Sequence, residues 1–271
     1  MKEYLKIGIF VSSEEESAIL IAQLSDIGFY AFEEEEKKLF AYIEKDNFNK
    51  AELDKLLPVN SRFNIEVIQE ENWNKNWEQN FQPVILGNFV AIRAKFHAPV
   101  REVKHEIIIT PKMSFGTGHH PTTLMMIKLM GRINFRSKTV IDFGTGTGVL
   151  AILAMKLGAS SVVAIDNDPW SIENAKENFE ENNCTGITVT KDETIRVGGQ
   201  SDIIVANINL NVLISNLQTL SRKTKPDGYL LLSGFLWKDE DIIKPAFTRE
   251  GFVYVDKEQV DDWCAMAFQK K

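Results

Sequence analysis

The stretch "VIDFGTGTGVL", residues 140–150, decides the fold of most of the chain. An apolar strand leads directly into three glycines, Gly144, Gly146 and Gly148, and an apolar helix begins right after them. A glycine-rich turn between a strand and a helix lets a ligand approach the backbone closely. The stretch therefore predicts an α/β domain with a ligand-binding turn at the carboxyl end of a strand.

The residues on either side of this turn alternate between apolar strands and helices. Strands are expected at 139–143, 161–166, 187–190, 202–207 and 229–235, and helices at 148–158, 169–182, 210–223 and 239–250. This alternation is typical of a doubly wound, mostly parallel sheet. Residues 252–270 read instead as two strands with a polar connection, which predicts an antiparallel hairpin at the end of the sheet.

The front of the chain has a different order of elements. The pattern predicts strands at 3–11, 29–34, 38–44 and 63–70, and helices at 12–28 and 47–57. Ser13 and Glu16 have the spacing of a capping box, and Gly28 ends the first helix. The βαββαβ order predicts a small ferredoxin-like α+β domain, a fold that by itself names no function.

The sequence thus divides into three predicted segments. These are a ferredoxin-like domain at 1–70, a linker helix with strands at 71–110, and the α/β domain at 111–271. In the linker, Trp73, Trp77 and Phe81 are four residues apart, which places them on one face of a helix. We interpret this stripe as core packing, with a groove for a partner or substrate as the alternative.

The negative charge is concentrated at the front of the chain. Residues 1–60 hold seven lysines and thirteen acidic residues, a net charge of −6 out of −7 for the whole sequence. Such a module repels a phosphate backbone and attracts a basic protein. We therefore expect no direct nucleic-acid binding. An acidic surface that only keeps the protein soluble is the alternative.

Neither a membrane segment nor a cysteine framework is evident. No apolar run is long enough to span a bilayer, and the first residues lack the pattern of a cleaved signal, so we expect a cytoplasmic protein. Cys184 and Cys264 are too few and too far apart for a disulfide framework or a zinc site. We expect both to be reduced thiols.

The glycine spacing narrows the choice of ligand. It is G-x-G-x-G, one residue shorter than the dinucleotide fingerprint. Asp142, two residues before the first glycine, would meet like charge in a bound pyrophosphate. A cationic ligand without phosphate fits better, and S-adenosyl-L-methionine carries both a sulfonium and an ammonium group.

Three further residues end or follow predicted strands, where open α/β sheets bind their ligands. Asp166 is placed to accept from both ribose hydroxyls of an adenosyl group. Asp192 is placed to accept from the adenine amine, with a solvated loop aspartate as the alternative. Asn207 is placed to accept from an amine through its amide oxygen, and a helix-capping role is the alternative.

Several stretches together resemble a known family. "FGTGHHPTT" (115–123), "DFGTGTG" (142–148), "AID" (164–166) and "VANI" (205–208) are similar to the class I S-adenosylmethionine-dependent methyltransferases, and more narrowly to the PrmA family that methylates ribosomal protein L11. The resemblance covers most of the chain, including residues 73–92 and 232–235. It implies a Rossmann-like methyltransferase domain preceded by a substrate-recognition domain.

The resemblance also implies roles for single residues. Through the resemblance, residues of the loop 115–123 join the candidates for cofactor binding. The full set is Phe115, Gly116, Thr117, Gly118, His120, Thr123, Asp142, Gly144, Gly146, Gly148, Asp166, Asp192 and Asn207. Asn207 would face the transferred methyl group and the acceptor, as the catalytic residue. His119 is an extra imidazole without an assigned role. We expect no metal site at the two histidines, because no carboxylate cluster stands near them, but a general-base role stays open.

The implied reaction is methyl transfer to amines. The resemblance implies methylation of lysine side chains of ribosomal protein L11, up to the trimethyl state, with the N-terminal amine as a further acceptor. The acidic front domain would bind this basic protein. A different protein, a small-molecule amine or a nucleic acid as acceptor is one alternative. The Asn-Pro-Pro-aromatic motif of base methylation is absent at Asn207, which weakens the nucleic-acid alternative. A module that senses S-adenosylmethionine without catalysis is another.

Overall fold

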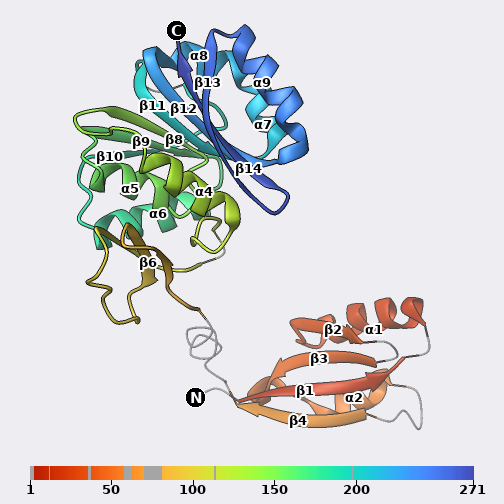
Figure 1. Ribbon diagram of the computed structural model, residues 1–271. Coiled ribbons are helices and arrows are strands. Elements are labelled where there is room, and N and C mark those ends of the chain that lie inside the picture. Colours follow the sequence, from red (N-terminus) through yellow and green to blue (C-terminus); the bar gives the residue numbers. More distant parts are fainter. Residues whose placement is uncertain are drawn as a thin grey trace. The chain divides into compact units, whose positions relative to one another are not determined.

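The computed structural model describes residues 3–11, 13–35, 38–57, 63–69, 81–112, 114–196 and 198–271. Its contacts divide the chain into two compact units, Met1–Asn80 and Phe81–Lys271 (Figure 1). From Phe81 onward, the segment predicted as a linker is part of the second unit. The predicted helix with Trp73 and Trp77 falls outside the described residues.

The first unit has the predicted ferredoxin-like order. Its elements are β1 (Glu3–Phe10), α1 (Glu14–Asp26), β2 (Ala31–Glu35), β3 (Lys38–Glu44), a 3-10 turn (Lys45–Asn47), α2 (Lys50–Leu56) and β4 (Phe63–Gln69). The sheet order is β2-β3-β1-β4, and all neighbours are antiparallel. At the start of α1 the Ser13 hydroxyl accepts from the Glu16 N–H at 3.2 Å, as the capping pattern predicts.

The second unit is built on a seven-stranded sheet. Its strands are β8 (Thr139–Phe143), β9 (Ser161–Asp166), β10 (Ile187–Lys191), β11 (Ser201–Asn207), β12 (Thr224–Leu236), β13 (Phe252–Val260) and β14 (Trp263–Lys270). The order is β10-β9-β8-β11-β12-β14-β13. Strands β8 to β12 run parallel, whereas β14 is antiparallel to both of its neighbours. This confirms the predicted sheet and its terminal hairpin.

Helices cover both faces of this sheet (Figure 1). They are α4 (Pro121–Met130), α5 (Val149–Lys156) and α6 (Pro169–Glu181) on one face, and α7 (Leu210–Ser215), α8 (Leu217–Lys223) and α9 (Glu240–Arg249) on the other. Each face of the sheet packs against its helices in a separate hydrophobic core. Successive strand residues point to opposite faces, so Val140 lies in one core and Ile141 in the other. The single helix predicted at 210–223 is divided at Asn216, whose side chain bonds the Val212 carbonyl and the Thr194 hydroxyl.

The second unit also contains a small sheet, whose strands precede the seven-stranded sheet in the sequence. The small sheet consists of β5 (Val84–Leu86), β6 (Val90–Ala94) and β7 (His105–Ile109). The side chains of Asn178 on α6 and of Asn182, which caps the carboxyl end of α6, bond backbone groups of Thr110 and Ile108 at 2.6–3.0 Å. These bonds fix the small sheet to the helical layer beside the glycine turn.

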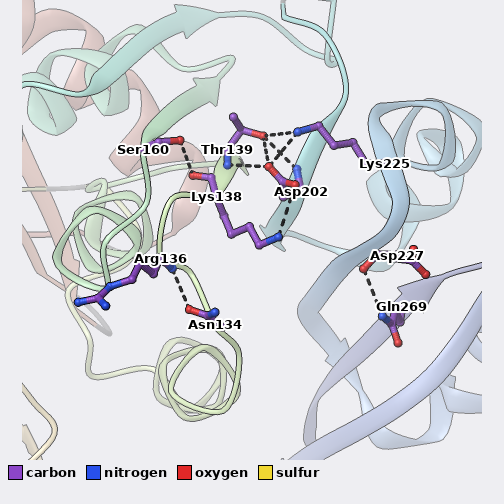
Figure 2. Close-up of polar contacts among 9 residues, drawn as sticks. All are labelled: Asn134, Arg136, Lys138, Thr139, Ser160, Asp202, Lys225, Asp227 and Gln269. Atoms are coloured by element: carbon purple, nitrogen blue, oxygen red, sulfur yellow. Dashed lines mark hydrogen bonds and ion pairs between the residues drawn. The ribbon is translucent and has the colours of Figure 1, made fainter.

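The amino edge of the large sheet is closed by an ion cluster (Figure 2). The Asp202 carboxylate accepts from the Thr139 N–H and hydroxyl at 2.9 and 2.7 Å and pairs with Lys225 at 2.9 Å and Lys138 at 3.8 Å. Burial acts to raise the pKa of Asp202, but the bonds from Thr139 and Lys225 outweigh it and hold the pKa below its ordinary value. The cluster joins the beginnings of β8, β11 and β12. The carboxyl ends of these strands lie on the opposite side of the sheet.

Within the described residues, no helix is both long and apolar enough to cross a bilayer. The same part of the chain contains no cluster of three or more histidine, cysteine or acidic side chains that could hold a metal ion.

Candidate active site

Two adjoining cavities lie at the carboxyl edge of the parallel strands. The first, of about 320 Å³, is lined by Phe115, Phe143, Gly144, Gly146, Asp166, Asn167, Ser171, Asp192, Glu193, Asn207, Ile208, Asn209 and Val212. The second, of about 240 Å³, is lined by Phe115, His120, Thr122, Asn207, Ile208, Asn209, Gly234 and Trp263. Four residues line both cavities: Phe115, Asn207, Ile208 and Asn209. Such a pair of cavities suits two reactants that meet at a shared wall.

The glycine turn forms part of the first cavity. Gly144, Gly146 and Gly148 all have positive φ, at 79°, 54° and 81°. A β-carbon on Gly146 would collide with the Phe115 carbonyl, and one on Gly148 with the Phe179 ring. Glycine is therefore required here by backbone conformation and by loop packing. Gly148 precedes α5 and lines neither cavity. Its role in the structure is to let the turn pass close to Phe179.

Asp142 lies behind the glycine turn and lines neither cavity. It is fully buried, and its Oδ2 accepts from the Thr145 hydroxyl at 2.7 Å and the Ala151 N–H at 3.1 Å. Burial raises the pKa of Asp142 to about 7, and the charge of Asp166 acts in the same direction. Asp142 therefore lies beneath the glycine turn and not in the cavity wall, tied to the turn and to α5, and its contact with a cofactor stays a prediction.

The raised pKa of Asp142 predicts a pH dependence of stability. The folded protein binds more protons than the unfolded chain between about pH 4 and pH 7, so this group makes stability fall as pH rises through that range. We expect Asp142→Asn to reduce the loss of unfolding free energy between pH 5 and pH 8 by about 2 kcal/mol. Urea unfolding of the ligand-free protein at both pH values measures this.

Asp261→Asn, at an exposed turn, is the control and should keep the wild-type difference between the two pH values. An Asp142→Asn protein whose stability changes with pH as much as the wild type would contradict the argument.

Asp166 and Asp192 both line the first cavity, at the ends of neighbouring strands. Asp166 accepts from the Gly146 N–H at 2.8 Å and the Asp168 N–H at 3.0 Å. Asp192 accepts from the Thr194 N–H at 3.2 Å and pairs with Arg196 at 3.6 Å. Each carboxylate oxygen keeps a second lone pair, so both side chains retain acceptors toward the cavity.

Residues 115–120 fold over the glycine turn. The Thr147 N–H donates to the Phe115 carbonyl at 2.9 Å, and the Thr147 hydroxyl donates to the Gly116 carbonyl at 2.7 Å. Gly118 packs against Ile92, where a β-carbon would lie 2.6 Å from its Cδ1. In this loop Phe115 lines both cavities, whereas Gly116, Thr117 and Gly118 line neither and maintain the loop's shape.

His120 caps the amino end of α4 and lines the second cavity. Its Nδ1 accepts from the Thr122 N–H at 3.3 Å and contacts the Thr122 hydroxyl at 2.8 Å. The neutral ring therefore carries its proton on Nε2. Burial lowers the pKa of His120, which favours the neutral ring. A role as general base is disfavoured, because the only lone pair of the ring is already engaged.

Asn207 ends β11 at the wall that the two cavities share. Its Nδ2 lies 3.5 Å from the Thr123 hydroxyl oxygen, which orients the amide. Its Oδ1 is buried and has no hydrogen-bond partner among the described residues. Leaving a buried acceptor unpaired costs about 1–3 kcal/mol. Asp142 Oδ1 and Asn174 Oδ1 are also unpaired among the described residues, but of the three side chains Asn207 is the one that lines the cavities. The Asn207 oxygen is a ready acceptor for a ligand N–H.

Trp263 is a lining residue that the sequence reasoning missed. Its ring packs against His120 with centroids 4.8 Å apart and closes the second cavity. A signal was present: the final strand of the predicted hairpin runs antiparallel to the others, so its first residue lies at the carboxyl edge. Ile208, Asn209 and Gly234 were missed as well.

A family model described as ribosomal protein L11 methyltransferase (PrmA) matches residues 5–271. The chain belongs to this family. Among curated ribosomal protein L11 methyltransferases, that of Phocaeicola vulgatus is 34% identical over 268 residues, covering 96% of this chain and 95% of its own. That of Chlorobaculum tepidum is 37% identical over 272 residues, covering 93% and 92%.

Solved structures agree with membership of the L11 methyltransferase family. The crystal structure of the ribosomal protein L11 methylase from Lactobacillus delbrueckii subsp. bulgaricus matches with a TM-score of 0.66 and 31% identity, over 70% of this chain and all of that one. A precorrin-6y C5,15-methyltransferase from Geobacter metallireducens matches with a TM-score of 0.51 over 60% of this chain and 94% of its own, but only 11% identity, which shows the fold alone. The predicted class I methyltransferase fold is confirmed.

Proposed function

We propose that the protein is an S-adenosylmethionine-dependent N-methyltransferase of ribosomal protein L11 that acts in the cytoplasm. Its acceptors are lysine side-chain amines, carried to the trimethyl state, with the N-terminal amine as a further acceptor. The observation that carries the proposal is the unpaired Oδ1 of Asn207, a residue that lines both cavities. The curated relatives that match nearly the whole chain bear the corresponding name.

The first cavity fits S-adenosylmethionine. Gly144 and Gly146 provide a backbone wall for its amino-acid end, Asp166 provides acceptors for the ribose hydroxyls, and Asp192 provides one for the adenine amine. Among the described residues its lining has three acidic side chains, Asp166, Asp192 and Glu193, and no basic one, which suits a cation and disfavours a pyrophosphate. When bound, the cofactor supplies an electrophilic methyl group on a sulfonium.

The second cavity fits an amine acceptor. Phe115, His120 and Trp263 contribute three aromatic rings to its lining, and an apolar surrounding lowers the pKa of a lysine amine. In the first two transfers Asn207 Oδ1 accepts from the amine N–H and thereby directs the nitrogen lone pair. The neutral dimethylamine that enters the third transfer has no N–H, and the aromatic walls hold it instead. With His120 disfavoured as a base, the amine loses its proton to solvent before transfer. Aromatic faces also hold methylated ammonium groups, which supports repeated methylation.

The first unit supplies a surface for the basic protein. Most of the net negative charge of the chain lies in residues 1–60. Charge of one sign on a module raises the association rate with a partner of opposite sign. We assign the recognition of L11 to this unit and no nucleic-acid contact to it.

The acceptor is tested by comparing purified ribosomal proteins one by one. Purified ribosomal proteins are incubated separately with the protein and methyl-labelled S-adenosylmethionine, and label in each is counted. We expect label in L11 and background counts in equally basic ribosomal proteins. Label in another protein but not in L11 would assign a different acceptor and contradict the proposal.

A further inference from the structure

His119 joins the loop over the glycine turn to a distant segment of the chain. Its Nε2 lies 2.9 Å from the Gln82 carbonyl oxygen, and its Nδ1 lies 3.2 Å from the Thr117 hydroxyl oxygen. The ring also packs edge-on against Phe81, with centroids 4.8 Å apart. Because a carbonyl oxygen only accepts, Nε2 carries a proton, and in the neutral ring Nδ1 accepts from Thr117.

The segment that His119 contacts is itself firmly held. The Phe81 carbonyl accepts from His97 Nε2 at 2.6 Å, while His97 Nδ1 accepts from the Ala94 N–H at 3.1 Å. The Phe81 and His97 rings stack with centroids 5.9 Å apart. The His97 carbonyl in turn accepts from Arg93, which is buried in β6. Two successive carbonyls, those of residues 81 and 82, thus each accept from an imidazole.

His119 supplies the hydrogen bond that anchors the middle of the loop to this support. The beginning of the loop is tied to Thr147, and its end caps α4 through His120. Between these ends, Gly118 packs on Ile92 and His119 bonds Gln82. The position of the middle therefore depends on the His119 side chain, which lines neither cavity itself.

We propose that His119 is a positioning residue that holds the loop of residues 115–120 over the first cavity by anchoring it to Phe81 and Gln82. The proposal rests on the proposed function, because it takes the ligand of the first cavity to be S-adenosylmethionine. His119 acts through the loop and touches neither reactant. Cofactor affinity depends on it, and the methyl-transfer step does not.

The test measures cofactor binding apart from turnover. Titration calorimetry of the full chain with S-adenosylhomocysteine, the demethylated product, is expected to show a Kd about tenfold higher for His119→Ala than for the wild type, because a hydrogen bond and a ring contact are lost. The KM for S-adenosylmethionine rises in parallel, and kcat changes less than about threefold. His119→Gln keeps an N–H donor and recovers part of the affinity.

His105→Ala is the matched control. His105 lies in the small sheet and packs its ring against Phe89, with centroids 5.5 Å apart, but no described contact joins its side chain to the loop. It should keep the wild-type Kd. Phe81→Leu should raise the Kd less than His119→Ala does. In the double variant the change in binding free energy should be smaller than the sum of the two single changes, because both substitutions remove the same ring contact.

The outcomes separate the two proposals. A wild-type protein that does not bind S-adenosylhomocysteine would contradict the proposed function itself. A wild type that binds, beside His119→Ala and His119→Gln proteins with unchanged Kd, would overturn the role of His119 alone. A large fall in kcat at unchanged Kd would also overturn it, since that result assigns His119 to the chemical step.

Discussion

Asn207→Ala is expected to lower kcat for L11 methylation by about 100-fold while the Kd for S-adenosylhomocysteine changes less than about threefold. The substitution removes a buried oxygen of the shared wall that has no other hydrogen-bond partner among the described residues and that accepts from the amine. A hydrogen bond to a charged or strongly polarised partner contributes about 1.5–3 kcal/mol, which corresponds to this change in rate. Single-turnover kinetics and titration calorimetry measure the two quantities.

The matched control is Asn211→Ala, an exposed asparagine four residues along the chain in α7. It should leave both quantities at their wild-type values. If Asn207→Ala turned over L11 at the wild-type rate, the unpaired amide oxygen would have no part in the reaction, and the proposed orientation of the amine would be wrong.

A shortened chain that begins at Asn72 is expected to bind S-adenosylhomocysteine like the full protein but to lose at least about 100-fold in kcat/KM with L11. The second unit has its own two hydrophobic cores and contains both cavities, so cofactor binding does not need the first unit. The first unit carries most of the net negative charge, and electrostatic steering alone changes association rates by 10- to 1000-fold.

A short lysine peptide from L11 controls for damage to the active site, since the full and shortened chains should methylate it equally well. Because salt screens electrostatic attraction, added salt should lower the rate at which the full chain methylates L11 more than the rate at which it methylates the peptide. Undiminished methylation of L11 by the shortened chain would remove the recognition role of the first unit.

The fold could be predicted from local patterns, because each element carries its own signal. The apolar strand at 139–143 runs into glycines that only a tight turn explains, and the two strands within 252–270 flank a polar connection. Both predictions are confirmed. The division of the helix at Asn216 could not be foreseen, since it depends on a hydrogen bond from Thr194, which is distant in sequence.

The candidate site was predicted less completely, because its walls come from distant parts of the chain. Asp142 is close to the glycines in sequence, but the first turn of α5 folds back and encloses it. Trp263 enters the second cavity only because β14 reverses direction. His119 had no role in any sequence motif, since its partner is a carbonyl 37 residues earlier.

The most direct test is intact-mass spectrometry of L11 after incubation with S-adenosylmethionine and either the wild-type or the Asn207→Ala protein. Mass gains in whole methyl steps, located on lysine residues or the N-terminal amine by peptide mapping and nearly absent with Asn207→Ala, are the result that we predict. No mass gain on L11 from a wild-type protein that binds the cofactor would contradict the proposed function.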